Sequence, residues 1–390
     1  MKICHIITRM IVGGAQENTL FTIIGHIAKG HEVVLITGPS PGPEGELLKK
    51  AEYPDFRIIE LPSLIRNINP VKDFKAYCEI KEILERENFD VVHTHASKAG
   101  IIGRCAAWNA KRRVPVVVHT VHGQAFHRYE KEWKNFIYKF LERFAAKHCH
   151  QIYAVAQAMI DQCVAAKIAP AKKYRVIYSG MDIEKFLNAV PEDNLREQLG
   201  IPAGAKVIGS VARLFPLKGY EDFIPCALQL ARRYNDLHFL IVGDGIMRNE
   251  INQRITQAGL AERFHFSGLV APDQVYRYIA LMNVLWHLSV REGLPRSVVQ
   301  ALAGGKPAIG YQLDGTPEVI LNDETGYCVP ERDLGAVMEN TIKILDSPEL
   351  AAQMGKRGRE LTRDKFDWHK MSDILEAEYL RLYKLNTGKK

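Results

Sequence analysis

The sequence lacks any run of about 18 apolar residues, the length that a membrane-spanning helix requires. We also expect no signal peptide, because Arg9 interrupts the apolar stretch 1–7 before a hydrophobic core of sufficient length can form. We therefore expect a cytoplasmic protein.

Metal-binding patterns are missing as well. No C-x-x-C pair occurs, and no histidines are grouped at the spacing of a metal site. Asp-x-Asp is absent, although sites for a divalent ion commonly hold it on paired carboxylates. We expect no required metal and no other cofactor. The cysteines lie far apart and are expected to be reduced core thiols: Cys4, Cys78, Cys105, Cys149, Cys163, Cys226 and Cys328.

The charge is positive, with 52 Lys and Arg against 45 Asp and Glu and a net charge of +7. An anionic ligand, a nucleic acid and an acidic membrane surface are all compatible with this balance. A nucleic-acid binder would need basic residues interleaved with aromatic residues on an exposed sheet, or a helix-turn-helix, and the sequence has neither pattern. An anionic small molecule or membrane is the remaining expectation.

Short β-branched runs alternate with amphipathic helical stretches through almost all of the chain, which is typical of parallel sheets covered on both faces. The pattern restarts after Gly180, and the polar segment 181–204 is the expected hinge. We predict an α/β protein with two Rossmann-like, doubly wound domains at 1–190 and 191–365 that face each other across a cleft. A helix within 366–390 is expected to cross back to the first domain. The predicted strands are 2–7, 32–37, 57–61, 91–94, 116–120, 151–155, 174–178, 206–211, 238–242, 264–266, 284–288, 308–311 and 327–329.

Three segments carry candidate anion or sugar contacts. Gly13 and Gly14 lie between a strand and a helix, where the backbone can approach a phosphate, although a tight turn without a ligand explains them equally well. Arg213 and Lys218 surround a turn after a strand, where cations would stabilise a departing diphosphate; solvated surface charges are the alternative. Glu292 precedes a helix and can accept hydrogen bonds from sugar hydroxyls, or serve as an ordinary acid at a helix start.

Several motifs, taken together in their order along the chain, make it resemble the retaining glycosyltransferases of the GT-B fold. The resemblance is specifically to family 4, which builds bacterial polysaccharides and glycolipids. The resemblance covers essentially the whole chain. It rests on GGAQENTL, HTHASKAGIIGR, HTVHG, VIYSGMD, VARLFPLKG, VGDG, REGLPRSVVQALAGGKP, DGTPEVI and the C-terminal helix. It implies a hexosyl or N-acetylhexosaminyl transferase whose first domain serves the acceptor and whose second domain binds the nucleotide sugar.

The resemblance also implies a role for each matching residue. Arg213 and Lys218 are expected to clamp the diphosphate, Glu292 to hold the hydroxyls of the donor sugar, and His122 to orient and polarise groups at the reaction centre. A histidine whose hydrogen bonds are satisfied at a strand end is the alternative for His122. The remaining donor contacts are expected from the Gly14, Gly293 and Leu294 amides and from Asp244 and Val270 around the base.

One position departs from the family pattern, in which a second glutamate follows the first after seven residues. Here Gln300 occupies that position. A glutamate there grips both ribose hydroxyls, whereas glutamine offers one acceptor oxygen and an uncharged donor. We expect weaker ribose binding, and we favour a uridine diphosphate sugar as the donor.

The acceptor is expected to be a glycan or a polyprenyl-linked sugar. His95 and Lys98 follow a strand of the first domain and are the acceptor-side candidates, although a lysine at a helix start explains Lys98 equally well. The helical stretch 129–150 combines aromatic residues with lysines, which suits an anionic membrane surface. The alternative is a core-packed helix with a solvated basic face.

Two other functions stay open. A GT-B sugar-nucleotide epimerase would need its own acid and base carboxylates on the sugar, and the sequence offers no such pair. An inactive relative that binds a sugar nucleotide would be compatible with Gln300, but the joint presence of Arg213, Lys218 and Glu292 argues for transfer.

Overall fold

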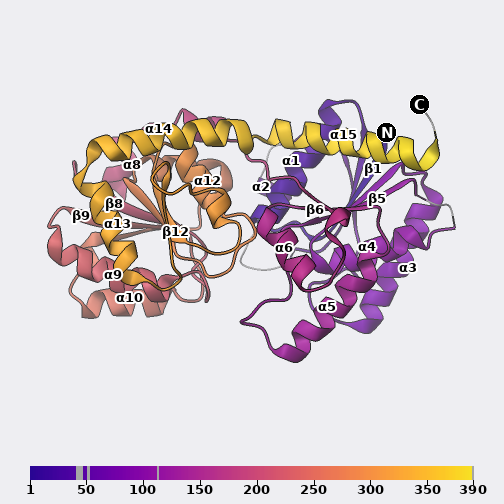
Figure 1. Ribbon diagram of the computed structural model, residues 1–390, viewed down its shortest axis with the longest axis horizontal. Helices are drawn as coiled ribbons and strands as arrows, with labels where there is room; N and C mark the ends of the chain where they lie inside the picture. Colours follow the sequence, from indigo (N-terminus) through magenta and orange to yellow (C-terminus); the bar gives the residue numbers. More distant parts are fainter. Residues whose placement is uncertain (41–46, 51–52, 112–113, 389–390) are drawn as a thin grey trace. The chain divides into compact units, whose positions relative to one another are not determined.

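A computed structural model describes residues 1–40, 47–50, 53–111 and 114–388. The chain forms two compact units, one of Met1–Met181 with Trp368–Lys390 and one of Asp182–Asp367 (Figure 1). Each unit contains a parallel sheet, of seven strands in the first and six in the second. The predicted α/β fold with two doubly wound domains is confirmed.

The first sheet has the strand order β3-β2-β1-β4-β5-β6-β7. Its inner strands are buried, β-branched runs, because helices cover both faces of a parallel sheet and leave little need for polar alternation, whereas the edge strand β3 is largely exposed. The strands are β1 Lys2–Arg9, β2 Glu32–Gly38, β3 Arg57–Glu60, β4 Val91–His95, β5 Val116–Val121, β6 Gln151–Ala154 and β7 Tyr174–Val176.

Two helices far apart in the sequence cover one face of this sheet together. Helix α15, Trp368–Thr387, lies beside α1, Gly14–Ala28, in Figure 1. A Cβ atom on Gly25 of α1 would lie only 2.1 Å from Oγ of Ser372 on α15, so glycine permits this close approach. Helix α4 contacts β1, β4 and β5 from the other face. The other helices of this unit are α2 Leu47–Lys50, α3 Pro70–Arg86, α4 Ser97–Trp108, α5 Glu132–Ala146 and α6 Gln157–Ala165.

The second sheet has the strand order β10-β9-β8-β11-β12-β13. Its core contains Phe223, Phe239 and Trp286, and the indole of Trp286 donates a hydrogen bond of 2.9 Å to Thr341. The strands are β8 Lys206–Val211, β9 Leu237–Val242, β10 Phe264–Gly268, β11 Val284–His287, β12 Ala308–Tyr311 and β13 Gly326–Val329. The helices are α7 Glu184–Leu187, α8 Asp193–Gln198, α9 Tyr220–Arg233, α10 Arg248–Gln257, α11 Val275–Ala280, α12 Arg296–Ala303, α13 Leu334–Asp346 and α14 Pro348–Lys365.

The segment expected as a hinge, 181–204, belongs almost entirely to the second unit, which begins at Asp182. Phe186 and Leu187 are buried there, and Arg277 forms a two-pronged ion pair with Glu192 at 2.8 and 2.6 Å. These contacts tie the segment to the helices of the second unit.

The strand order reverses direction between β1 and β4 in the first sheet and between β8 and β11 in the second. In open α/β sheets, ligands bind outside the carboxyl ends of the strands at such a point. The loops after these four strands are therefore where a site is expected. Among the described residues, no helix combines the length and the apolar character that a membrane span requires.

Candidate functional site

The turn after β8 presents Lys218 at the carboxyl edge of the second sheet. Gly219 has φ of +82°, and a Cβ atom there would lie 2.0 Å from the carbonyl oxygen of Leu288. Glycine is thus required both for the backbone conformation and for the close approach to the end of β11. The hydroxyl of Ser289 donates to the carbonyl of Leu217 at 3.1 Å, so the loops after β8 and β11 are joined.

Lys218 and Glu292 meet across these two loops. Nζ of Lys218 donates to Oε1 of Glu292 at 2.6 Å, and both side chains are about one-fifth exposed, at 22% and 19%. Burial alone would raise the pKa of the Glu292 carboxyl, but the attraction of Lys218 and the hydrogen bonds from Lys218 and Ser289 lower it below its usual value. Glu292 is therefore ionised at neutral pH and can accept hydrogen bonds.

Two further residues support Glu292, and sequence analysis missed both. Nε2 of His287 lies 3.7 Å from Oε1 of Glu292, and burial lowers the pKa of His287 to about 4, so this imidazole is neutral at neutral pH. The backbone N–H of Glu292 donates to Oδ2 of Asp314 at 2.7 Å. His287 ends a strand next to the switch point, which is the signal that could have identified it.

The other predicted donor residues of this unit lie at the same edge of the sheet. Arg213 is exposed, and its guanidinium lies 5.1 Å from the centre of the Phe215 ring. Asp244 follows β9, and its side chain accepts a hydrogen bond from the N–H of Gly245 at 2.8 Å. Its carbonyl accepts from the N–H of Leu214 at 3.0 Å, which joins this turn to the loop of Arg213.

Four donor candidates of the second unit remain to be located. Val270 follows β10 and is half-buried. Gly293 and Leu294 are buried in the loop between β11 and α12, and Gln300 is half-buried on α12. The structure thus brings Lys218 and Glu292 into direct contact, and it arranges the other candidates of this unit on loops of neighbouring strands or on α12.

In the first unit, Gly14 is the first residue of α1, directly after the loop from β1, as the sequence predicts. Lys98 lies in the first turn of α4, where Nζ forms an ion pair of 2.6 Å with Asp73 and donates to the carbonyl of Asn67. These contacts direct the lysine toward α3.

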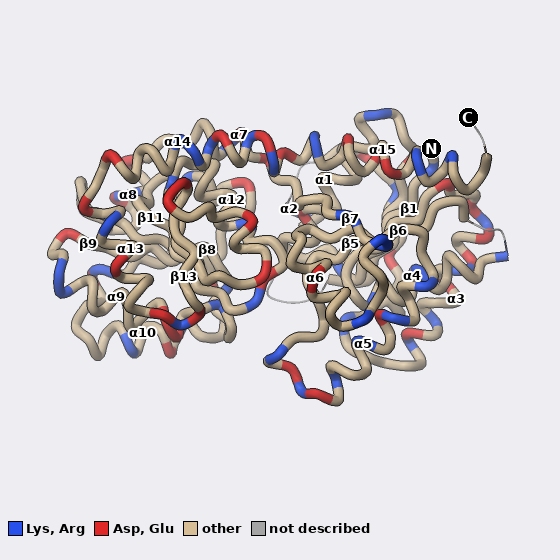
Figure 2. Tube along the Cα trace, in the orientation of Figure 1, with Lys and Arg blue, Asp and Glu red and all other residues tan. Residues whose placement is uncertain are grey.

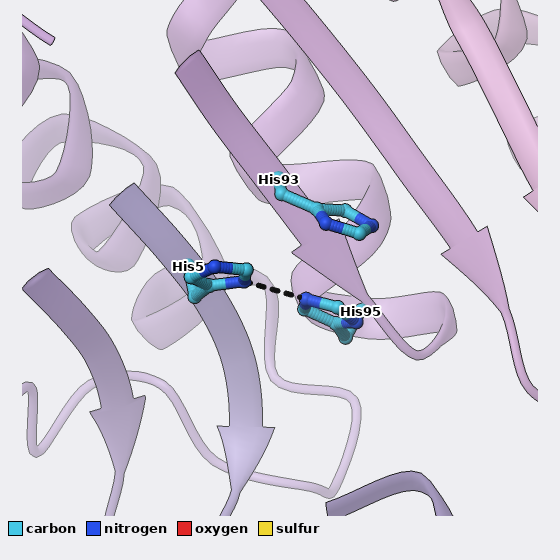
Figure 3. A group of neighbouring side chains, drawn as sticks. All are labelled: His5, His93 and His95. Carbon is cyan, nitrogen blue, oxygen red and sulfur yellow. Dashed lines mark hydrogen bonds between the residues drawn. The ribbon is translucent and has the colours of Figure 1, made fainter. Parts of the chain in front are cut away.

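His122 and His95 lie next to each other, but in different surroundings. His122 is half-buried after β5, whereas His95, at the end of β4, is fully buried. Nδ1 of His95 lies 3.1 Å from Nε2 of His122, and Nε2 of His95 lies 3.0 Å from Nδ1 of His5 on β1 (Figure 3). Both ring nitrogens of His95 therefore contact other histidines, and the side chain has no exposed surface.

His5, His93 and His95 form a fully buried group with one ligand-type nitrogen each within 4.8 Å of the others. Among the described residues, this is the one group whose side chains lie close enough together to hold a metal ion. Both nitrogens of His93 already have partners, since Nδ1 contacts the hydroxyl of Tyr379 at 2.5 Å and Nε2 that of Thr120 at 2.7 Å. The grouping escapes sequence spacing because His5 comes from β1, whereas His93 and His95 come from β4.

Comparisons with known proteins agree with this architecture. Residues 12–185 match the family model described as Glycosyltransferase Family 4, and residues 191–361 match the one described as Glycosyl transferases group 1. A relative from Escherichia coli is named UDP-Gal:alpha-D-GlcNAc-diphosphoundecaprenol alpha-1,3-galactosyltransferase; it is 29% identical over 386 residues, which is 97% of each chain. N-acetyl-alpha-D-glucosaminyl L-malate synthase from Bacillus anthracis is 26% identical over 90% of this chain and 89% of its own.

Solved structures show the same fold. Anabaena HepE in complex with UDP and glucose has a TM-score of 0.80 at 20% identity, with 98% of this chain and 99% of that chain covered. The two family models follow one another along the chain and leave few residues unmatched between them. The chain belongs to family 4 of the glycosyltransferases, with the GT-B fold, and it is a glycosyltransferase.

Proposed function

We propose that this enzyme transfers a sugar, with retention of its anomeric configuration, from a UDP-sugar to a polyprenyl-diphosphate-linked or glycan acceptor in the synthesis of cell-surface polysaccharide or glycolipid. The observation that carries the proposal is the contact between Lys218 and Glu292 at the switch point of the second sheet. A cation and a carboxylate held there match the two halves of a nucleotide sugar, the diphosphate and the sugar hydroxyls.

In the proposed reaction, the bond between the anomeric carbon and the donor phosphate oxygen breaks. Negative charge then grows on the leaving diphosphate, where Lys218 and Arg213 stabilise the transition state more than the ground state. The acceptor oxygen bonds to the anomeric carbon on the same face, and its proton passes to a donor phosphate oxygen. Glu292 accepts hydrogen bonds from the sugar hydroxyls, and His122 orients the groups that react.

The donor's backbone and base contacts complete the proposed site. The amides of Gly14, Gly293 and Leu294 contact phosphate or sugar, and Asp244 and Val270 border the base. Gln300 accepts one ribose hydrogen bond and donates another. Two fixed cations supply positive charge to the diphosphate, so the reaction is proposed to need no metal.

UDP as the donor nucleotide is supported by the names of similar proteins. The Escherichia coli relative is named for a UDP-galactose donor and a diphosphoundecaprenol-linked acceptor, and HepE is described in complex with UDP. We therefore propose the same chemical classes of donor and acceptor here, without specifying the sugar.

A donor panel tests the proposal. Glycosyltransferases slowly hydrolyse their donor, so the protein is incubated with UDP-, GDP- and ADP-sugars, with and without a chelator, and free nucleotide is measured. UDP release that persists with the chelator supports the proposal. A product sugar of inverted configuration, release that requires a metal, or conversion of the donor to an epimer without release of nucleotide would contradict it.

We further propose that α5 contacts an anionic membrane surface, where a polyprenyl-linked acceptor resides. Phe136 and Phe140 on α5 are 70% and 59% exposed, and Trp133, Ile137 and Phe144 are exposed as well. Basic positions lie along the same helix and its flanks, as Figure 2 shows by colour. Exposed aromatic residues beside lysines suit the interface of an anionic bilayer, where rings insert and cations meet phosphates. The basic residues of this stretch are Lys131, Lys134, Lys139, Arg143 and Lys147.

Vesicle sedimentation tests this contact with a matched control. Replacement of both Phe136 and Phe140 by serine should abolish binding to phosphatidylglycerol vesicles. The control replaces Val71 and Phe74 by serine, because these residues of α3 are 79% and 68% exposed but lie on another helix. Equal loss in both variants, or equal binding to neutral phosphatidylcholine vesicles, would contradict the proposal.

A further inference from the structure

A row of three histidines runs from the interior of the first unit to His122. His5 on β1, His95 at the end of β4 and His122 after β5 are joined by nitrogen–nitrogen distances of 3.0 and 3.1 Å. In Figure 3 the rings of His5 and His95 point toward each other from neighbouring strands. The register of the sheet places His5 opposite His93, two residues before His95, so these side chains share one face.

The first two members of the row are uncharged. Burial lowers the pKa of His5 to about 3, and burial, together with the neighbouring His93, lowers the pKa of His95 well below its ordinary value. A neutral imidazole has one N–H donor and one acceptor nitrogen. The direction of the first hydrogen bond therefore fixes the direction of the second.

The direction of these hydrogen bonds depends on Nε2 of His5, the ring nitrogen that does not contact His95. Nε2 of His5 is buried and has no hydrogen-bond partner among the described residues. A buried N–H without an acceptor is rarer than an acceptor without a donor, so the proton of His5 is expected on Nδ1. His5 then donates to Nε2 of His95, and Nδ1 of His95 donates to Nε2 of His122. The proton of neutral His122 is left on Nδ1.

We propose that His5 and His95 are positioning residues that hold His122 in the tautomer protonated on Nδ1, which presents an N–H donor at the reaction centre. The inference rests on the proposed role of His122 in sugar transfer. His5 and His95 act through His122, since both are fully buried.

The surroundings favour this arrangement over a metal bound to His5, His93 and His95. Both nitrogens of His93 contact hydroxyls, of Tyr379 and Thr120, so a metal would have to displace one of them. His26, whose ring centre lies 5.8 Å from that of His5, is also buried, and burial lowers its pKa well below the ordinary value. The three side chains that could hold a metal are all histidines, and no carboxylate belongs to the group.

Two variants of His95 separate positioning from packing. Glutamine can accept from His5 with its carbonyl oxygen and donate to His122 with its amide, whereas leucine can do neither. His95→Leu should lower kcat by roughly 10- to 100-fold with little change in KM, the size of effect found when the partner that orients a metal-bound histidine is removed. His95→Gln should restore most of the turnover.

His26→Leu serves as the matched control. It changes a buried neighbour whose nitrogens have no hydrogen-bond partner among the described residues, so turnover should stay near that of the wild type. Equal loss of turnover in His26→Leu and His95→Leu, or no rescue by His95→Gln, would overturn the positioning role.

The tautomer itself is measured by NMR on protein labelled with nitrogen-15 histidine, with His122→Gln used to assign the signal. The expected result is a proton on Nδ1 of His122 in the wild type and in His95→Gln, and a mixture of tautomers in His95→Leu. A proton on Nε2 in the wild type, an unchanged tautomer in His95→Leu, or a stoichiometric metal found by mass spectrometry would overturn the proposal. Wild-type turnover in His122→Gln would refute the proposed role of His122, while the tautomer would still report on the histidine row.

Discussion

Replacement of Lys218 by methionine tests the ion pair with Glu292 at the centre of the proposed donor site. The attraction between charges 2.6 Å apart is about 6 kcal/mol at an effective dielectric constant of about 20. Desolvation of the two groups offsets most of this attraction, and a charge-assisted hydrogen bond contributes about 2 kcal/mol net. We expect the free energy of unfolding of Lys218→Met to fall by about 2 kcal/mol at neutral pH.

The stability loss should depend on pH in a definite direction. In the wild type the pKa of Glu292 lies below its ordinary value, so its contribution is present above the unfolded pKa and is lost as pH falls through the folded value. Without Lys218, burial raises the pKa of Glu292, and stability decreases as pH rises through that value. The difference between wild type and variant should therefore grow from about pH 4 to pH 7 in chemical denaturation.

The activation free energy of Lys218→Met should change by more than its free energy of unfolding. Loss of one group that stabilises a developing charge costs about 3 kcal/mol, or about 150-fold in kcat. Lys206→Met is the matched control. Lys206 is the first residue of β8, at the opposite end of this strand from the loop of Lys218, and its Nζ lies 4.0 Å from Asp236. If Lys218→Met loses stability as expected but hydrolyses the donor as fast as Lys206→Met, the pair is structural and our assignment of the donor site is refuted.

Three further predictions concern nucleotide binding and the attachment of α15. Gln300→Glu should lower the KM for the donor more than it changes kcat, because a carboxylate grips ribose hydroxyls in the ground state; steady-state kinetics with a larger change in kcat would contradict the ribose role. Gly25→Ala should lower stability by about 1–3 kcal/mol because its Cβ would overlap Ser372, and thermal unfolding should show partial recovery in Gly25→Ala with Ser372→Gly. Glu376→Gln should destabilise the protein at neutral pH but little below about pH 4, because Lys29 and His31 lower the Glu376 pKa against the opposing effect of burial; unfolding curves with the same loss at both pH values would contradict this.

The strands could be predicted because buried parallel strands are continuous β-branched runs. The run 116–120 is β5, Val116–Val121, and the helix expected after 368 is α15, Trp368–Thr387. Boundaries shifted by a residue or two, since strand ends depend on pairing rather than on side-chain type. The junction between the units, at Met181 and Asp182, could not be placed so closely, because the contacts of Glu192 with Arg277 are tertiary.

The candidate site was predictable where loop position alone decides it. Lys218 and Glu292 were expected near a ligand because each follows a strand, and the structure places them at the switch point. Lys98 was an acceptor-side candidate, with an ordinary lysine at a helix start as the alternative, and the structure pairs it with Asp73 of another helix. A lysine at a helix start has several partners within reach, and tertiary packing selects among them.

The sequence by itself determined the local elements of this protein, because hydrophobic patterns and glycine turns act over a few residues. It also determined the order of those elements, and hence two parallel sheets. Only the tertiary structure decided which distant side chains meet. His5 reaches His95, 90 residues away, through the register of β1 on β4, and strand register is a property of the assembled sheet that residue spacing does not contain.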